Sequence, residues 1–149
     1  ADEHSIEVQL PILARLADAP KIVGLTVARP SLETLQEAAK QLADAISEME
    51  TPPLLVVSTD MNHFADLETT KRVDALALDA IEALDPFRLY NTVNDNEISM
   101  CGVSGCVLFM ETLKHLGRLT RCERVGYTTS AEASGGSSRV VGYAGLLLG

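Results

Sequence analysis

The chain has 149 residues, 16.0 kDa and 46% hydrophobic residues, which suits one domain with a hydrophobic core and excludes a disordered chain. Its 12 Lys and Arg against 21 Asp and Glu give a net charge of -9, which argues against nucleic-acid binding, since that needs clustered basic side chains. Three cysteines without a C-x-x-C pair favour a reducing cytoplasm, and no stretch approaches the roughly 20 apolar residues of a membrane span.

Helices and strands alternate in the first part of the sequence. Apolar residues recur at helical spacing over 4–17, with Pro11 expected to kink this helix or delay its start. The β-branched run 21–28 is typical of a covered strand, and an amphipathic helix is predicted over 32–49. The run 54–58 reads as a second strand, apolar on both faces as parallel strands are.

The second part continues this alternation. Asp66 is expected to cap a long helix that stops at Asp85-Pro86, and a short helix follows. Further expected elements are a helix over 101–116 closed by Gly117, two strands in 121–129 and 139–148, and an irregular Gly/Ser loop over 130–138. The alternation predicts an α/β protein, a layered sandwich whose helices flank a mixed, largely parallel sheet.

The stretch STDMNHF, residues 58–64, places an acid and an imidazole three residues apart where a buried strand should end. Ligands of open α/β sheets gather beyond the carboxyl ends of strands, so Asp60 and His63 are candidate catalytic residues. An imidazole suits general acid/base work, and a nearby carboxylate can hold its tautomer. The alternative is that Asp60 caps the turn and His63 packs partly exposed.

Three further residues are candidates for the lining of a site. His4 and Glu7 stand at i and i+3 on one helical face, where they can serve together as ligands or as an acid and base, or form a helix-start salt bridge. Cys101 stands before Gly102 at the expected start of a helix, where a thiolate is stabilised, although an unpaired cysteine is often simply buried. Cys106 and Cys122 read as core residues.

Five motifs resemble the Memo family and occur in the order found there. They are EHSIEVQLP (3–11), STDMNHF (58–64), LDP (84–86), MCG (100–102) and YTTSAEASGGSSRVVGYAG (127–145). The resemblance implies a fold similar to the class III extradiol dioxygenases, which are non-haem iron enzymes, with a metal-type cleft at one sheet edge. It also implies that Asp60 and His63 line that cleft, with His63 as the acid/base toward a substrate hydroxyl, and that His4, Glu7 and Cys101 lie near it.

Two departures from the family pattern stand beside these matches. The family's two metal-facing histidines belong to motifs that precede EHSIE, so we expect residues 1–149 to be the C-terminal portion of a single Memo-like domain of bacterial type, without its N-terminal portion. The family's third metal ligand, a Cys in animal members, falls at Ala133, beside Glu132. Iron or copper is therefore expected only in the full-length protein, and no metal is expected in this chain alone.

The resemblance leaves more than one function open. The first hypothesis is a metal-dependent, dioxygenase-like oxidoreductase that acts on a small aromatic or redox substrate. The alternative is a non-catalytic ligand- or partner-binding protein on the same fold. A third, a metal-independent hydrolase using Cys101 with His63, lacks a supporting motif. Expected partners are the N-terminal half of the same protein or a second chain, with a homo-oligomer as a further option, and neither nucleic acid nor membrane.

Overall fold

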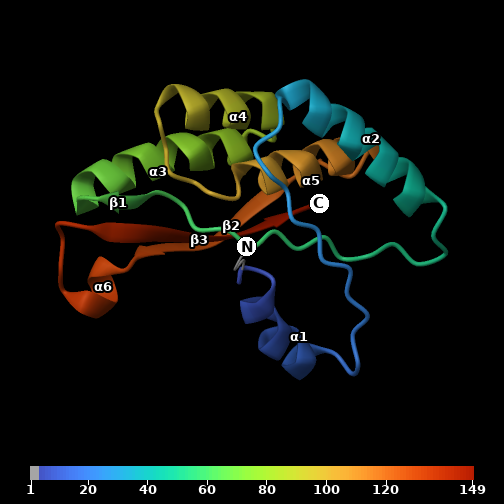
Figure 1. Ribbon diagram of the computed structural model, residues 1–149, viewed down its shortest axis with the longest axis horizontal. Coiled ribbons are helices and arrows are strands. Elements are labelled where there is room, and N and C mark those ends of the chain that lie inside the picture. Colours follow the sequence, from blue (N-terminus) through green and yellow to red (C-terminus); the bar gives the residue numbers. More distant parts are fainter. Residues whose placement is uncertain (1–3) are drawn as a thin grey trace.

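A computed structural model describes residues 4–149, which form an α/β structure of helices and one small sheet (Figure 1). The sheet contains β1 (His63–Ala65), β2 (Cys122–Thr129) and β3 (Val140–Leu148). The helical elements are η1 (Glu7–Gln9), α1 (Leu10–Leu16), α2 (Leu32–Ser47), α3 (Leu67–Glu82), α4 (Pro86–Asp95), α5 (Val103–His115) and α6 (Ala131–Ser134).

The sheet is antiparallel, with strand order β1-β3-β2. Strands β2 and β3 pair along nearly their whole length, from Cys122 opposite Leu148 to Thr129 opposite Gly142, and β1 adds a short edge beside Val141. The expectation of a mixed, largely parallel sheet is therefore wrong for the part of the chain that the structure describes. The two late strands were predicted correctly, but the parallel strands that should have accompanied them are not formed.

Residues 21–28 and 54–58, which were expected to be covered strands, run as irregular segments instead. Their apolar composition predicts strand, but a strand forms only where a neighbour takes its backbone hydrogen bonds. Neither segment pairs with a strand in residues 4–149, and several of their apolar side chains stay in solvent: Val23 is 87% and Leu54 83% exposed.

The long helices follow local sequence signals. The Ser31 hydroxyl caps α2 by accepting from the Thr34 amide at 3.3 Å. The Asp66 carboxylate caps α3 in the same way, from the Thr69 amide at 2.9 Å, as the sequence predicted.

The start of the chain and the late Gly/Ser loop also follow from their residues. Pro11 sits in the first turn of α1, so the predicted delayed start is confirmed. The loop expected over 130–138 contains the short helix α6, which ends at Gly135 with φ of 72°.

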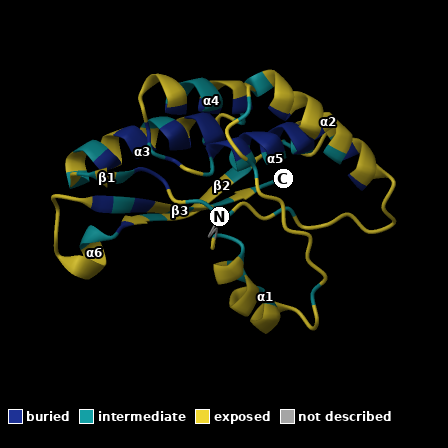
Figure 2. Cartoon of the chain, in the orientation of Figure 1, coloured by how far each residue is buried: buried dark blue, intermediate teal, exposed yellow. Residues whose placement is uncertain are grey.

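Helices α2, α3, α4 and α5 lie along one side of the sheet, and α1 lies on the other (Figure 1). Helix α3 contacts all three strands, α5 contacts α2 and α4, and the buried residues lie mainly on these helices (Figure 2). The largest fully buried apolar side chains are Leu35, Leu78, Leu89, Met100, Val107 and Val140. The core is thus made by helices against one face of the sheet.

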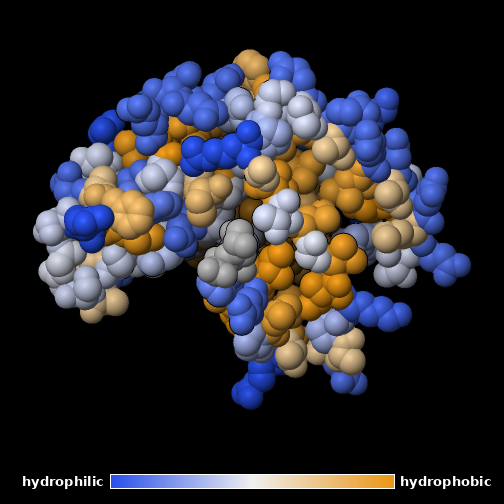
Figure 3. Space-filling model, in the orientation of Figure 1, coloured by the Kyte–Doolittle hydropathy of each residue, from blue (hydrophilic) through white to orange (hydrophobic). Residues whose placement is uncertain are grey.

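The surface around α1 and the irregular segments is rich in apolar side chains, shown in orange in Figure 3. The exposed apolar residues of these parts include Val8, Ile12, Leu16, Val23, Leu25, Leu54 and Val56. Exposed apolar areas of this kind mark interaction surfaces or aggregation sites. Within residues 4–149, no helix has the length and apolar character needed to span a membrane.

Candidate functional site

The STDMNHF turn is fixed to the sheet through its backbone. The Met61 amide donates to the Gly142 carbonyl at 3.0 Å, and the Gly142 amide donates to the Asn62 carbonyl at 2.8 Å. Met61 and Asn62 are both buried. The turn that carries Asp60 and His63 is therefore fixed to β3 by backbone hydrogen bonds on both sides of the Met61–Asn62 peptide.

The His63 imidazole is half-buried, and its Nδ1 lies 3.3 Å from the Met61 carbonyl oxygen. A carbonyl oxygen only accepts, so this contact requires a hydrogen on Nδ1. The Nε2 of a neutral ring is then the free basic nitrogen. In this tautomer, proton exchange with a bound ligand would take place at Nε2.

Phe64, the next residue, has a left-handed backbone with φ of 74°. Its ring is 66% exposed and meets the His63 ring edge to face, with the centroids 4.5 Å apart. The Arg139 guanidinium also lies over the Phe64 ring, 5.3 Å from its centroid. Non-glycine residues rarely adopt this backbone conformation, and such strain collects at functional sites.

Asp60 is exposed, and its carboxylate forms no hydrogen bond or ion pair with residues 4–149. The polar contact of the turn at this point comes from Thr59, whose hydroxyl donates to the Asp60 carbonyl at 2.9 Å. The part of the alternative in which the Asp60 side chain caps the turn is thus wrong, whereas His63 is partly exposed, as that alternative expected. Its proposed place beside His63 in a cleft remains a prediction.

Thr59 connects the turn to Cys101. The Thr59 hydroxyl accepts from the Gly102 amide at 2.8 Å and lies 3.8 Å from the Cys101 sulfur. Gly102 is the N-cap of α5, so the Thr59 hydroxyl, 43 residues earlier in the sequence, accepts a hydrogen bond from a backbone amide at the start of this helix. A Cβ at Gly102 would overlap Thr59, so this close approach requires glycine. Cys101 is exposed beside the turn, and its place in the lining of a cleft remains a prediction.

His4 and Glu7 form the predicted pair, with Nδ1 and Oε2 2.9 Å apart. Both side chains are well exposed, at 69% and 71%, and this ion pair is the helix-start interaction that the sequence allowed. Their segment reaches the turn through Gln9, whose amide donates to the Ser58 hydroxyl at 3.0 Å. The structure therefore brings this segment close to the turn without placing the pair against His63.

Sequence reasoning missed Asp74, a fully buried carboxylate on α3. Burial raises its pKa, while hydrogen bonds from the Asn62 amide and the Tyr127 hydroxyl, and the charge of His63, lower it. The pKa of Tyr127 is raised well above its usual range, by burial first and then by Asp74. The available signal was an acid in the apolar stripe of α3, four residues after Thr70 and four before Leu78.

The position at which the family resemblance predicts a third metal ligand lies on the short helix α6. Ala133 and Glu132 lie on α6, and the methyl group of Ala133 has no donor atom. No group of three His, Cys, Asp or Glu side chains within residues 4–149 is arranged to hold a metal ion. The residues present do not fit an iron or copper centre by themselves.

Cys106 packs against the core, and burial raises the pKa of its thiol to about 12, so it behaves as a core residue, as predicted. Burial also raises the pKa of Cys122, with Glu82 as a second cause. These two thiols are poor nucleophiles in this setting.

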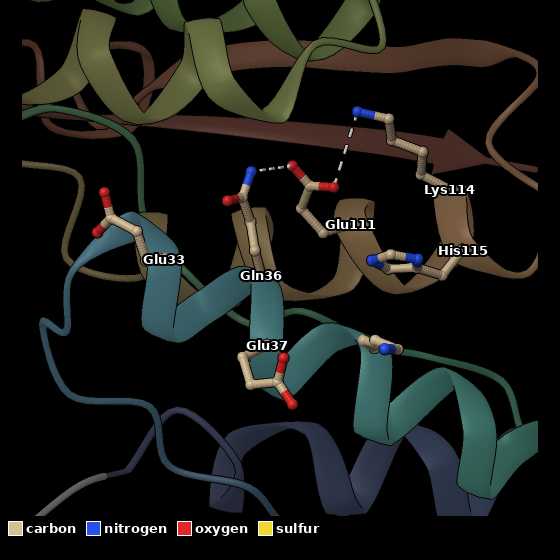
Figure 4. Close-up of a pocket in the computed structure, with 7 residues that line it drawn as sticks. Glu33, Gln36, Glu37, Glu111, Lys114 and His115 are labelled. Atoms are coloured by element: carbon tan, nitrogen blue, oxygen red, sulfur yellow. Dashed lines mark hydrogen bonds and ion pairs between the residues drawn. The ribbon is translucent and has the colours of Figure 1, made fainter.

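A hollow of about 520 Å³ lies between α2 and α5 (Figure 4). In it the buried Glu111 carboxylate accepts from the Gln36 amide at 3.3 Å and lies 3.8 Å from the Lys114 ammonium. His115 is on its wall, at the end of α5. None of the predicted site residues lines this hollow, so it is separate from the STDMNHF turn.

The described chain is thus an α/β protein with a histidine-bearing turn fixed to an antiparallel sheet. Its sequence matches the family model described as "Memo: Memo-like protein" over residues 1–147. The chain belongs to this family.

Three of the relatives that the chain matches show the degree of similarity. The chain is 36% identical over 146 residues to a "MEMO1 family protein" of Desulfurococcus amylolyticus, covering 97% of this chain and 51% of that protein. It is 35% identical over 145 residues to the Archaeoglobus fulgidus protein of the same description, covering 97% and 54%. A Thermotoga maritima relative is 34% identical over 146 residues, covering 98% and 50%. The chain spans about half the length of these curated relatives.

Proposed function

We propose that the chain is part of a Memo-like oxidoreductase related to the class III extradiol ring-cleavage dioxygenases, acting on a small aromatic or redox substrate. In this proposal His63 is the acid/base residue, and Asp60 lines the same cleft. The observation that carries it is the Nδ1 contact of His63 with the Met61 carbonyl, which leaves Nε2 as the basic nitrogen. Nε2 would take the proton from a substrate hydroxyl.

The proposal assigns the metal, iron or copper, to the longer protein. Residues 4–149 contain no suitable donor set, so no step of the reaction is derived through a metal here. What this chain supplies is the proton-transfer group, held on the turn by the backbone contacts with Gly142. The N-terminal portion, or a second chain, is proposed as the partner that completes the cleft.

The test uses the protein at the full length of its relatives, with bound iron and copper measured and catechol ring opening followed by absorbance and oxygen uptake. We expect His63→Gln to lower turnover by about 10²-fold or more, the usual contribution of an acid/base group, with metal content unchanged. His115→Gln is the matched control, since His115 lies on the separate hollow. Loss of metal in His63→Gln would make His63 a ligand and refute the acid/base role.

The second candidate is a non-catalytic binding protein on the same fold. It is favoured by the apolar side chains that segments 21–28 and 54–58 expose, among them Val23 and Leu54. An intact protein that binds no metal and turns over no catechol would support this candidate against the first.

A further inference from the structure

Asp74 accepts two hydrogen bonds from groups on different parts of the fold. The Tyr127 hydroxyl of β2 donates to Oδ2 at 2.8 Å, and the Asn62 backbone amide donates to Oδ1 at 2.7 Å. The carboxylate is fully buried, and no Lys or Arg forms an ion pair with it among residues 4–149. The two donors are therefore the main compensation for burying this group.

The contacts continue from Asn62 to the backbone of His63 through Ser99. The Asn62 side-chain oxygen accepts from the Ser99 amide at 3.0 Å and lies 2.9 Å from the Ser99 hydroxyl. That hydroxyl accepts from the His63 amide at 2.9 Å and lies 2.8 Å from the His63 carbonyl. The single hydroxyl hydrogen of Ser99 is shared between the Asn62 side-chain oxygen and the His63 carbonyl, while the hydroxyl oxygen accepts from the His63 amide and the Ser99 amide binds Asn62.

The side chain of Asn62 is fixed at its other end as well. Its amide nitrogen donates to the Thr70 hydroxyl at 3.3 Å, one helical turn before Asp74 on α3. Helix α3 therefore forms two hydrogen bonds with Asn62. Asp74 binds its backbone amide, and Thr70 binds its side chain. Few orientations of the residue before His63 satisfy both contacts.

We propose that Asp74, supported by Tyr127, is a positioning residue for His63 and acts through Asn62 and Ser99. It fixes the turn in the conformation that places the His63 Nδ1 against the Met61 carbonyl. The importance of this orientation rests on the proposed function, but the positioning itself is a structural property that is measurable without any activity.

The test is hydrogen exchange of backbone amides and NMR of histidine side chains in the protein and its variants. The chain has three histidines, so the signals of His4 and His115 serve as internal references. In Asp74→Ala we expect the exchange rates of the Asn62 and His63 amides to rise at least 10-fold more than those of the α2 and α5 amides. We also expect the His63 ring signal to shift. In Tyr127→Phe, which removes one donor, we expect a smaller change of the same kind.

Asp74→Asn should rescue the orientation. An asparagine oxygen still accepts from the Asn62 amide, and its nitrogen can donate to the Tyr127 hydroxyl oxygen. Asp79→Asn, a change at an exposed position on the same helix, is the control. It should leave the amide exchange rates and the His63 ring signal unchanged.

The outcomes of these experiments separate this proposal from the proposed function. If Asp74→Ala and Tyr127→Phe leave the exchange at Asn62 and the His63 signal unchanged, the positioning role is wrong. If Asp74→Ala fails to fold, Tyr127→Phe is the deciding variant. Unchanged exchange at Asn62 and an unchanged His63 signal in Tyr127→Phe would then show that the positioning role is wrong. If the signals change as expected while the intact protein shows no turnover, the positioning stands and the catalytic proposal falls.

Discussion

Gly142 of β3 lies against the Asp74 carboxylate so closely that a Cβ at residue 142 would overlap it. We therefore expect Gly142→Ala to lower the free energy of unfolding by about 1–3 kcal/mol, the usual effect of overpacking a close-packed interior. Urea unfolding measures the change. Gly145→Ala is the matched control on the same strand, because a Cβ there would sit 3.7 Å from Val125, an ordinary contact.

A double variant separates this collision from a general weakening of β3. In the Asp74→Ala background the carboxylate is gone, so Gly142→Ala should be clearly less destabilising than in the natural sequence. Equal losses in both backgrounds would show that the two residues are independent.

The raised pKa of Asp74 predicts a pH dependence of stability. Because burial raises this pKa above the ordinary 3.8, the folded state holds the proton over a range where the unfolded state has released it. Unfolding free energy should then fall as pH rises from about 3.8 through the folded pKa, with a slope of at most about 1.4 kcal/mol per pH unit. Asp74→Asn should lose this dependence, and Asp79→Asn should keep it. Parallel curves for all three proteins would contradict the assignment.

The left-handed backbone of Phe64 predicts an unusual order of stability between two variants. Both Phe64→Ala and Phe64→Gly lose the exposed ring, but only glycine relieves the φ of 74°. Phe64→Gly should be more stable than Phe64→Ala by about 1 kcal/mol in urea unfolding. At Phe87, exposed in α4, the order should reverse, because glycine weakens a helix.

The exposed apolar segments predict association. Val23 and Leu54 are 87% and 83% exposed, so we expect the chain to self-associate through these segments. Light scattering during gel filtration should show a smaller species for Val23→Asp with Leu54→Asp. Phe87→Asp, an exposed apolar residue on α4, is the control. A stable monomer of the natural sequence would refute this expectation.

Much of the helical structure was readable because its signals are local. Ser31 and Asp66 cap α2 and α3 through residues three positions later, and the apolar spacing of each helix defines its buried face. The family assignment and the placement of Cys101 at a helix start were likewise readable from short motifs.

The remainder depends on contacts between distant residues. The runs 21–28 and 54–58 carry strand composition, but whether they pair is decided by neighbours that the local sequence does not specify. The same holds for Asp74, whose importance comes from Asn62, 12 residues earlier, and Tyr127, 53 residues later. The sequence shows that Asp74 is an acid within a helix, but only the fold shows that it accepts hydrogen bonds from Asn62 and Tyr127.

The Thr59 hydroxyl has a consequence for how the chain folds. The Gly102 amide at the N-cap of α5 has its protein partner 43 residues earlier, so until that long loop closes this hydrogen bond can be made only to water and the helix start lacks its contact with Thr59. The C-terminal turns of α5 need no such closure. Folding kinetics should therefore show the beginning of α5 forming late, together with the STDMNHF turn, so that Cys101 takes its place beside the turn only in the last steps.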